Sequence, residues 1–520
     1  MRIKFLFISL LIFIQVTAQH TNIMISNTQL PEEPSIMINP KNVKYIVAGA
    51  NIRSAYYSSD TGRTWLAQQL TSSFGVNGDP AIICDTTGNF YFFHLSNTPG
   101  GSFIDRIVCQ KSVNNGVTWS NGAAIGLNGA KAQDKQWAVV DKRNNNIYTT
   151  WTQFDRYGSA SPLDSSVILF SKSTDGGTSW NTPLRISQKA GDCFDDDNTT
   201  EGAVPAVGPN GEIYVAWAGP NGLAFNKSTD GGNTWMATDK IINPIPGGWA
   251  FDIPGISRAN GLPVTVCDVS NGPRRGTIYV NWADQRYGTN DTDIWLVKST
   301  DGGINWSTPA RVNNDTTHTQ QFFTWMNIDQ ATGYLYFVFY DRRNYTGNQT
   351  DVYMARSNDG GSTFQNFKIS QVPFAPVSNI FFGDYTNLSV ANGIIRPIWT
   401  RLDAGNLSIW TALIDTTLIP GVVTPSTNPN ELINDFITYP NPFTNNSFVS
   451  FKLKTAAAVT ISVYDIAGRL MGKPVKNKMY QPGKYVERID SKLMHITPGN
   501  YFYTITANGK LYTRKTIRIE

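Results

Sequence analysis

The sequence is poor in charged residues. Asp, Glu, Lys and Arg make up 16% of the 520 residues, against about 25% in an average soluble protein. Aromatic residues nevertheless reach 12%. A chain with little charge and many aromatic residues can bury a core, which argues against a disordered or coiled-coil protein. The net charge of +4 is too small to predict nucleic-acid binding.

The signatures of several common protein classes are also missing. The four cysteines have no C-x-x-C spacing, so a structural zinc site is not expected, and we expect Cys84 and Cys267 to be free and buried. After the N-terminal leader, no apolar run approaches the length of a membrane-spanning helix. Walker, Rossmann and G-x-S-x-G motifs are absent, which leaves nucleotide and serine-hydrolase chemistry without support.

Charge is distributed unevenly along the chain. Residues 1–19 begin with Arg2 and Lys4, continue with a short apolar run and end in small and polar residues, which is typical of a secretory signal peptide. Residues 20–435 contain 28 basic and 35 acidic residues, whereas residues 436–520 contain 13 basic and 4 acidic residues. An acidic body is therefore joined to a basic tail, and we expect the two parts to have different roles.

One short pattern recurs six times in the body. Its frame is Ser-x-Asp-x-Gly-x-Thr-Trp, and the copies lie at 58–65, 112–119, 173–180, 228–235, 299–306 and 357–364. The Asp or Asn side chain can accept hydrogen bonds from backbone amides of its own turn. Glycine adopts backbone angles that other residues avoid, and the aromatic residue can pack into the core. Each copy therefore predicts a hairpin turn with an aromatic anchor.

A second pattern recurs seven times and consists of an apolar run, a turn and a strand that ends in an aromatic residue. The copies lie at 36–48, 81–93, 138–151, 205–217, 264–282, 324–340 and 386–399. Each predicts the first two strands of a four-stranded blade, and the six turns join strands three and four. The seventh unit has a third strand at 407–414 but no fourth, while a strand at 21–26 lacks a partner. We therefore predict an all-β, seven-bladed β-propeller over residues 20–415 in which the N-terminal strand completes the last blade.

The remaining residues predict a linker and a second small domain. Residues 416–435 lack periodicity and are rich in Pro, Thr and Asn, as linkers are. Short alternating strands follow at 448–454, 459–471, 485–490, 499–509 and 515–519. They predict a small β-sandwich over residues 436–520.

Four motifs of this tail carry a family resemblance. Tyr439–Phe443, Val463–Arg469, Pro498–Tyr501 and the final Lys515–Glu520, in this order, resemble the C-terminal sorting domain of the type IX secretion system of Bacteroidetes. The resemblance implies that residues 436–520 engage the type IX secretion machinery. It also implies removal of the signal peptide and the tail, followed by release or anchoring at the outer-membrane surface. A carbohydrate-binding sandwich is the alternative.

The recurring turn of the body resembles the Asp-box of sialidases and other proteins with bacterial neuraminidase repeats. The resemblance implies a sialidase-like propeller that acts on extracellular glycans or glycoproteins, with exo-sialidase-like glycoside hydrolysis as the leading enzymatic hypothesis. A non-catalytic module that binds glycan or protein is the alternative, because Asp-box turns brace many propellers of different function. The sialidases resemble six-bladed propellers and carry an Arg-Ile-Pro motif that this sequence lacks, so no catalytic residue is transferred from them by motif.

Acidic residues and arginines recur in the loops of one propeller face, where ligands usually bind near the axis. The candidates for substrate binding are Arg286, Arg343, Arg401, Asp284 and Asp341. The planar guanidinium group suits bidentate binding of a carboxylate, such as that of a sialic or uronic acid. The alternative is that the arginines clamp loops, with Asp293 and Asp351 pairing with Arg286 and Arg342.

Other candidates lie near the starts of the innermost strands. The predicted catalytic residues are Glu201, Asp384, Tyr385 and Asp79, with Glu33 and Asp134 in similar positions. Crowded carboxylates raise one another's pKa, which can provide a general acid beside a carboxylate base or nucleophile, and sialidases use a tyrosine nucleophile. The alternative is that these acids cap strand amides or bind a cation.

One acidic loop suggests a metal. Residues 191–202 contain Asp195 and Asp197, whose hard oxygen ligands suit calcium. A solvated acidic loop is the alternative. No cofactor is required by any other pattern.

Overall fold

The computed structural model describes residues 20–416, 419, 432–441, 443–465 and 468–519. The chain divides into two compact units between residues 418 and 419, within the predicted linker. The predicted signal peptide and most of the predicted linker lie outside the described residues. Within these ranges the secondary structure is almost entirely β, and no helix there is long and apolar enough to cross a membrane.

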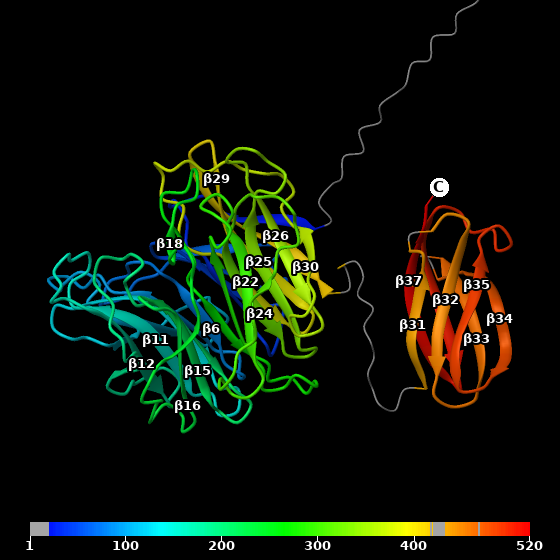
Figure 1. The fold of residues 1–520 in the computed structure, drawn as a ribbon, viewed down its shortest axis with the longest axis horizontal. Coiled ribbons are helices and arrows are strands. Elements are labelled where there is room, and N and C mark those ends of the chain that lie inside the picture. The colour runs from blue at the N-terminus through cyan, green and yellow to red at the C-terminus, as the bar shows by residue number, and fades with distance from the viewer. Residues whose placement is uncertain (1–19, 417–418, 420–431, 442, 466–467, 520) are drawn as a thin grey trace, which may run out of the picture. The chain divides into compact units, whose positions relative to one another are not determined.

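The described part of the N-terminal unit contains seven four-stranded antiparallel sheets (Figure 1). Six of them are built from four strands that pair in chain order, and their bounds follow. The first three sheets comprise β2 (Ser35–Ile38), β3 (Ile46–Ala50), β4 (Ser54–Ser58) and β5 (Leu66–Gln69); β6 (Ala81–Cys84), β7 (Phe90–Leu95), β8 (Ile107–Ser112) and β9 (Ala123–Ile125); and β10 (Ala132–Val140), β11 (Ile147–Phe154), β12 (Ser166–Ser173) and β13 (Leu184–Arg185).

The next three sheets follow the same rule. They comprise β14 (Glu201–Val207), β15 (Ile213–Gly219), β16 (Gly222–Ser228) and β17 (Lys240–Asn243); β20 (Val264–Cys267), β21 (Ile278–Asp284), β22 (Asp293–Ser299) and β23 (Ala310–Arg311); and β24 (Gln321–Asp329), β25 (Tyr334–Asp341), β26 (Asp351–Ser357) and β27 (Gln365–Lys368). A separate two-stranded ribbon, β18 (Ala250–Phe251) and β19 (Ala259–Asn260), lies in the long connection between β17 and β20.

The last sheet joins the two ends of the unit. It contains β28 (Asn387–Ala391), β29 (Ile394–Asp403), β30 (Asn406–Asp415) and, at its edge, β1 (Thr21–Ser26). Strand β1 pairs antiparallel with β30, with Thr21 opposite Leu413. This confirms the predicted pairing of the N-terminal strand with the stretch 407–414.

The first strands of the seven sheets surround a common interior. Strands β2, β6, β10, β14, β20, β24 and β28 contact one another in this order, and β28 contacts β2. All seven line one cavity of about 530 Å³. The four-stranded sheets and their cyclic contacts are those of propeller blades.

The six recurring turns have the predicted geometry. In the copy at 228–235, the Ser228 hydroxyl donates to Oδ1 of Asp230 over 2.8 Å, and the amides of Gly232 and Thr234 donate to Ser228 and Asp230. Hydrogen bonds from the hydroxyl and the amide of Thr234, and from the Ser228 hydroxyl, lower the pKa of Asp230 below its usual value. Each turn follows the third strand of its sheet, and Trp235 packs edge-on against Phe170 of the preceding sheet. All four cysteines are buried and free.

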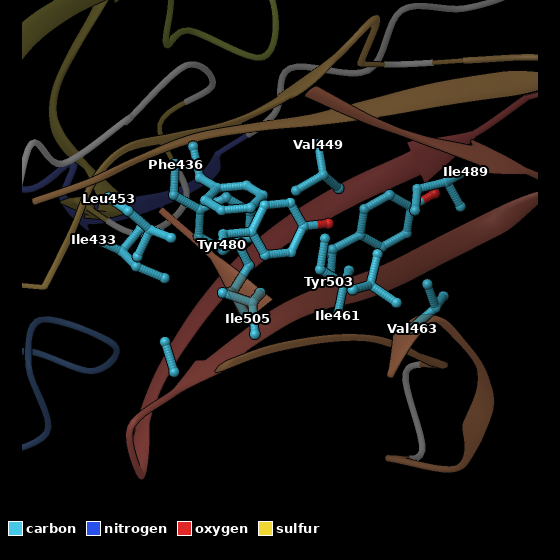
Figure 2. Packing of buried hydrophobic residues seen from close by; sticks show 14 of the residues in the cluster. Ile433, Phe436, Val449, Leu453, Ile461, Val463, Tyr480, Ile489, Tyr503 and Ile505 are labelled. Atoms are coloured by element: carbon cyan, nitrogen blue, oxygen red, sulfur yellow. The ribbon is translucent and has the colours of Figure 1, made fainter. Parts of the chain in front are cut away.

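The C-terminal unit is built from two antiparallel sheets. The smaller contains β31 (Ile433–Tyr439), β32 (Asn446–Leu453) and β35 (Gly483–Asp490), and the larger contains β34 (Leu470–Tyr480), β33 (Ala457–Asp465), β36 (Gly499–Ala507) and β37 (Lys510–Arg518). Side chains of both sheets, among them Val449, Ile489, Ile461, Tyr503 and Ile505, pack in one buried core (Figure 2). This is the predicted sandwich.

Two strand predictions in this unit were wrong. The stretch 459–471 is not one strand, because the chain reverses between β33 and β34, where Asp465 accepts a hydrogen bond from the amide of Arg469 and Gly468 has a φ of +78°. Strand β31 begins at Ile433, within the predicted linker. The start of this strand was not predicted, because its sequence contains polar residues and resembles the linker. Its pairing with β32, which stabilises it, involves residues outside the local sequence pattern.

Candidate functional site

Charged side chains gather at one end of the ring, at the starts of the first strands. Glu33, Asp79 and Lys135 have φ values of +49°, +49° and +51°. Residues with a side chain rarely adopt this left-handed conformation, and it often marks functional sites. We call Glu33, Asp79, Lys135 and Asp384, together with Arg258, the mouth cluster.

Lys135 is the centre of the mouth cluster. Its Nζ atom lies 2.9 Å from Oδ2 of Asp384, 3.1 Å from Oδ2 of Asp79 and 3.7 Å from Oε1 of Glu33. Burial alone would lower the pKa of Lys135, but the carboxylates of Asp384, Asp79 and Glu33 raise it well above its usual value. The ammonium group therefore stays charged and joins β10 to the segments that precede the first strands of three other sheets.

Arg258 reaches the same place from the loop between β18 and β19. Its Nε donates to Oδ1 of Asp384 over 3.0 Å, its Nη2 donates to Oδ2 of the same carboxylate, and its Nη1 donates to Asp195 over 3.0 Å. Burial would raise the pKa of Asp384, but Lys135 and Arg258 lower it to about 2. Asp384 is thus ionised throughout the neutral range. Asp195 also accepts a hydrogen bond from the hydroxyl of Tyr157 over 2.7 Å.

Burial favours the protonated form of other carboxyl groups around the mouth cluster. Glu201, the first residue of β14, is 1% exposed, and neither of its oxygens accepts a hydrogen bond from the described residues. Burial, followed by the charge of Asp195, raises the pKa of Glu201 well above its usual value. Burial also raises the pKa of Asp134 to about 7, although Lys135 opposes it. A carboxyl group that keeps its proton near neutral pH can act as a general acid.

Aromatic residues and two members of the mouth cluster together line a small pocket, which we call the mouth. Trp137 of β10 and Trp325 of β24 approach to 4.3 Å between ring centroids, and Tyr385 lies 5.2 Å from Trp137. Together with Lys135 and Asp384, these rings line a pocket of about 30 Å³. Both tryptophans also line the cavity of about 530 Å³, as do Val204 and Val264, so these residues lie between the pocket and the cavity.

The structure brings the predicted catalytic residues together. Asp79 and Asp384 bind Lys135, the Lys135 ammonium lies 5.9 Å from the Tyr385 ring centroid, and Glu201 is influenced electrostatically by Lys135. Burial, followed by Asp79 and Glu33, raises the pKa of Tyr385 well above its usual value, so its phenol stays protonated. The catalytic role of these residues stays a prediction.

The predicted substrate-binding arginines lie elsewhere and are paired. Arg286 binds Asp284 at 2.6 Å, Arg343 binds Asp341 at 2.6 Å and Arg401 binds Asp403 at 2.9 Å. Each guanidinium group also lies over an aromatic ring, those of Trp295, Tyr353 and Trp410. This arrangement agrees with the alternative in which the arginines clamp loops, and substrate binding by them stays a prediction.

The expected partners of the clamp were wrong. Asp293 pairs with Arg311 and Asp351 pairs with Lys368. An aspartate two residues earlier on the same chain is already within reach of Arg286 and of Arg343, so neither needs a partner across the hairpin. Arg342 instead donates to Thr350 and Gln320.

The two cations of the mouth were missed by the sequence analysis. Lys135 directly follows the predicted Asp134, but its partners come from distant loops. The signal for Arg258 was the interval of 71 residues between the turns that start at Ser228 and Ser299, the longest in the series, which marks an insertion.

The acidic loop 191–202 directs its carboxylates to different partners. Asp195 binds Arg258 and Tyr157, whereas Oδ1 of Asp197 accepts the amide of Ala250 over 2.8 Å. In the described ranges, no three His, Cys, Asp or Glu side chains are arranged to hold a metal ion. Calcium binding by Asp195 and Asp197 stays a prediction.

Several solved structures resemble the model weakly. An ulvan lyase of polysaccharide lyase family PL25 has a TM-score of 0.46 and 12% identity, covering 77% of this chain and 96% of that chain. The NanB sialidase of Streptococcus pneumoniae has a TM-score of 0.43 and 11% identity, with 71% and 83% coverage. The sialidase of Trypanosoma rangeli has a TM-score of 0.39 and 10% identity, with 88% and 85% coverage.

The sequence comparisons concern the C-terminal unit. No curated protein matches this chain. Residues 438–520 match the model of the secretion system C-terminal sorting domain, in agreement with the four motifs of the tail. The chain therefore carries a type IX sorting domain, and the protein is secreted or attached at the outer-membrane surface.

Proposed function

We propose that the protein is a secreted, seven-bladed, sialidase-like propeller that hydrolyses glycosidic bonds of extracellular glycans or glycoproteins at the mouth cluster. The sorting domain supports an extracellular substrate. The seven sheets with cyclic contacts support a closed propeller, and in propellers the end of the axis is the usual ligand site.

The observation that carries this proposal is the buried Glu201, whose pKa is raised well above its usual value by burial and by the charge of Asp195. Glycoside hydrolysis needs a carboxylic acid that protonates the leaving oxygen and a carboxylate on the other side of the bond. Glu201, which keeps its proton, would supply the first group. As the C–O bond breaks, its proton passes to the leaving oxygen, and water adds to the anomeric carbon while a carboxylate such as Asp79 accepts the water's proton. The ionised Asp384 would stabilise the positive charge that develops on the sugar ring.

The proposal is tested with the purified protein and a panel of sialyl, uronyl and neutral glycosides. Replacing a general acid typically lowers the rate by about 10²- to 10⁴-fold, so Glu201→Gln should reduce kcat/KM by this amount. Asp384→Asn should also reduce it. The matched control is Asp230→Asn, which makes the same kind of substitution in a recurring turn outside the mouth cluster. Unchanged activity in both mouth variants would refute the assignment of the site.

A non-catalytic module is the second candidate. Exposed aromatic rings border the mouth, as in sugar-binding surfaces. Phe381, which is 39% exposed, lies 5.4 Å from the Arg258 guanidinium, and Phe103, 63% exposed, packs against Tyr157. Glycan or protein binding without cleavage of any glycoside in the panel would favour this function.

We also propose that export depends on the tail and ends with its removal. The protein lacking residues 436–520 should fail to reach the medium or the cell surface, whereas the full chain should appear there without its signal peptide and its tail. Normal export of the truncated protein would contradict this role. Mass spectrometry of the exported protein identifies its first and last residues and so tests both cleavages.

A further inference from the structure

We infer that the mouth binds a sugar that presents hydroxyl or ammonium donors and carries no carboxylate. The inference rests on the proposed function, because it concerns the same site. The inferred ligand differs from the sialic and uronic acids that the predicted substrate-binding arginines would suit.

The first argument is the balance of charge around the mouth. Seven carboxyl groups and two cations lie there; the carboxyl groups are those of Glu32, Glu33, Asp79, Asp134, Asp195, Glu201 and Asp384. Burial raises the pKa of four of them, Glu32, Glu33, Asp134 and Glu201. The other three, Asp79, Asp195 and Asp384, already pair with the two cations, Lys135 and Arg258. An entering carboxylate would therefore meet several carboxyl groups and no unpaired cation of the mouth cluster.

The second argument is that both cations are already engaged. Lys135 has three carboxylates within 3.7 Å, and Arg258 binds Asp384 through two nitrogens and Asp195 through a third. Recognition of a sugar acid usually requires a guanidinium fork that can face the carboxylate. The arginines with that potential, Arg286, Arg343 and Arg401, are paired with their own aspartates.

The third argument concerns buried carboxyl oxygens that lack a hydrogen-bond partner. Both oxygens of Glu201, Oε1 of Glu33 and Oε2 of Glu32 have no hydrogen-bond donor among the described residues, and the three residues are 1%, 2% and 9% exposed. A buried acceptor without a donor costs free energy. Because their pKa values are raised, these carboxyl groups favour the protonated form, in which each has one O–H donor and one C=O acceptor. A sugar hydroxyl can pair with both, whereas an entering carboxylate can only accept.

The shape of the pocket agrees with this chemistry. Its volume of about 30 Å³ admits a single small group, such as a hydroxymethyl or an ammonium group. The surrounding rings of Trp137, Trp325 and Tyr385 offer apolar faces to the C–H side of a sugar. The pocket would therefore receive one substituent of the sugar and leave the rest of the ring above it.

The test compares matched sugars on the full-length purified protein by calorimetry. Methyl glucoside and methyl glucuronide differ only in a hydroxymethyl group and a carboxylate at the same carbon, and we expect the glucoside to bind at least tenfold more tightly. Methyl glucosaminide distinguishes an ammonium donor from a hydroxyl donor, because it should bind more tightly than the glucoside only if the ammonium enters the mouth. Matched galacto and manno pairs extend the comparison to other ring stereochemistry.

Variants of the mouth provide the sharper measurement. Asp79→Asn removes one carboxylate from Lys135, so it should shift the ratio of the two Kd values toward the glucuronide by tenfold or more. Glu33→Gln should act in the same direction if Asp79→Asn does not fold. Asp230→Asn should leave the ratio unchanged.

The outcomes separate this inference from the proposed function. Equal or tighter binding of the glucuronide by the unaltered protein would overturn the inference and leave glycan binding intact. An unchanged ratio in both mouth variants would also overturn it. If no sugar of any matched pair is bound and no glycoside is cleaved, the proposed function itself fails, and the inference fails with it.

Discussion

The Nζ atom of Lys135 lies 2.9 Å from Oδ2 of Asp384, although 249 positions separate the two residues in the sequence. Lys135 belongs to the first strand of the third sheet, and Asp384 precedes the first strand of the last sheet. Their contact forms only when the sheets have closed into a ring. The candidate site and the closure of the fold are therefore coupled through one ion pair.

Replacing Asp384 should destabilise the fold strongly. Removal of one partner from a buried ion pair typically costs about 3–5 kcal/mol, because the other charge remains buried. Asp384→Asn leaves Lys135 and Arg258 with fewer carboxylates, and we expect a loss of this size in urea unfolding at pH 7. The double variant Lys135→Met/Asp384→Asn should recover part of it. A loss below about 1 kcal/mol would contradict the burial of the pair.

The difference in unfolding free energy between Asp384→Asn and the unaltered protein should also depend on pH. The pKa of Asp384 is lowered from 3.8 to about 2 in the folded protein. Its stabilising contribution is fully present above the ordinary pKa and is lost as the pH falls through about 2. The difference in unfolding free energy should thus be constant from pH 5 to 7 and shrink below pH 4.

Asp134 should show the opposite dependence. Burial raises its pKa from 3.8 to about 7. Its contribution to stability is therefore fully present below the ordinary pKa and is lost as the pH rises through about 7. Asp134→Asn keeps an oxygen that can accept the amide of Lys135, which donates to Oδ1 over 2.8 Å. We expect the variant to gain stability relative to the unaltered protein between pH 4 and 8. If the difference in unfolding free energy between the variant and the unaltered protein is the same at pH 4 and pH 8, Asp134 does not have a raised pKa.

The contrast between the fold and the site shows which features a sequence can reveal. The turns were predictable because Ser228, Asp230 and Gly232 bond one another within five positions. The closure of the ring was predictable because the strand 21–26 and the stretch 407–414 each lacked a partner. Arg258 and Lys135 could not be predicted in their roles, because their carboxylates are brought near only by the tertiary fold. The sequence showed an aspartate close to each of the predicted substrate-binding arginines. It could not show whether the two side chains pair with each other or bind a ligand, because both cases give the same sequence pattern.

The recurring turns should affect stability and not activity. Asp230 accepts hydrogen bonds from its own turn as a helix-capping residue does, and replacement of such a residue by alanine typically costs about 0.5–2 kcal/mol. Asp230→Ala should lower Tm with unchanged kcat/KM. The turn at 112–119 carries Asn114 in the same position, so Asn114→Asp should preserve or slightly raise Tm. A loss of activity in folded Asp230→Ala would indicate that the turns belong to the site.

Calcium at the acidic loop makes a separate prediction. Asp195 is engaged by Arg258, and an ion would have to compete with this guanidinium group. We therefore expect a rise in Tm only at millimolar calcium, reversed by a chelator and lost in Asp195→Ala/Asp197→Ala. Magnesium at the same concentration is the control for ionic strength. The absence of a shift at millimolar calcium would reject the site.

The contact between Trp137 and Trp325 should be required for the mouth. Truncation of a buried tryptophan to alanine typically costs about 3–5 kcal/mol, and Trp137→Ala would also join the mouth to the cavity of about 530 Å³. Since the rings touch, a double-mutant cycle with Trp325→Ala should give a coupling of about 0.5–1.5 kcal/mol in urea unfolding. Trp235→Ala, which removes an anchor from a recurring turn, should destabilise the fold without weakening sugar binding. Equal effects of Trp137→Ala and Trp235→Ala on sugar binding would show that the tryptophan pair stabilises the fold but does not shape the mouth.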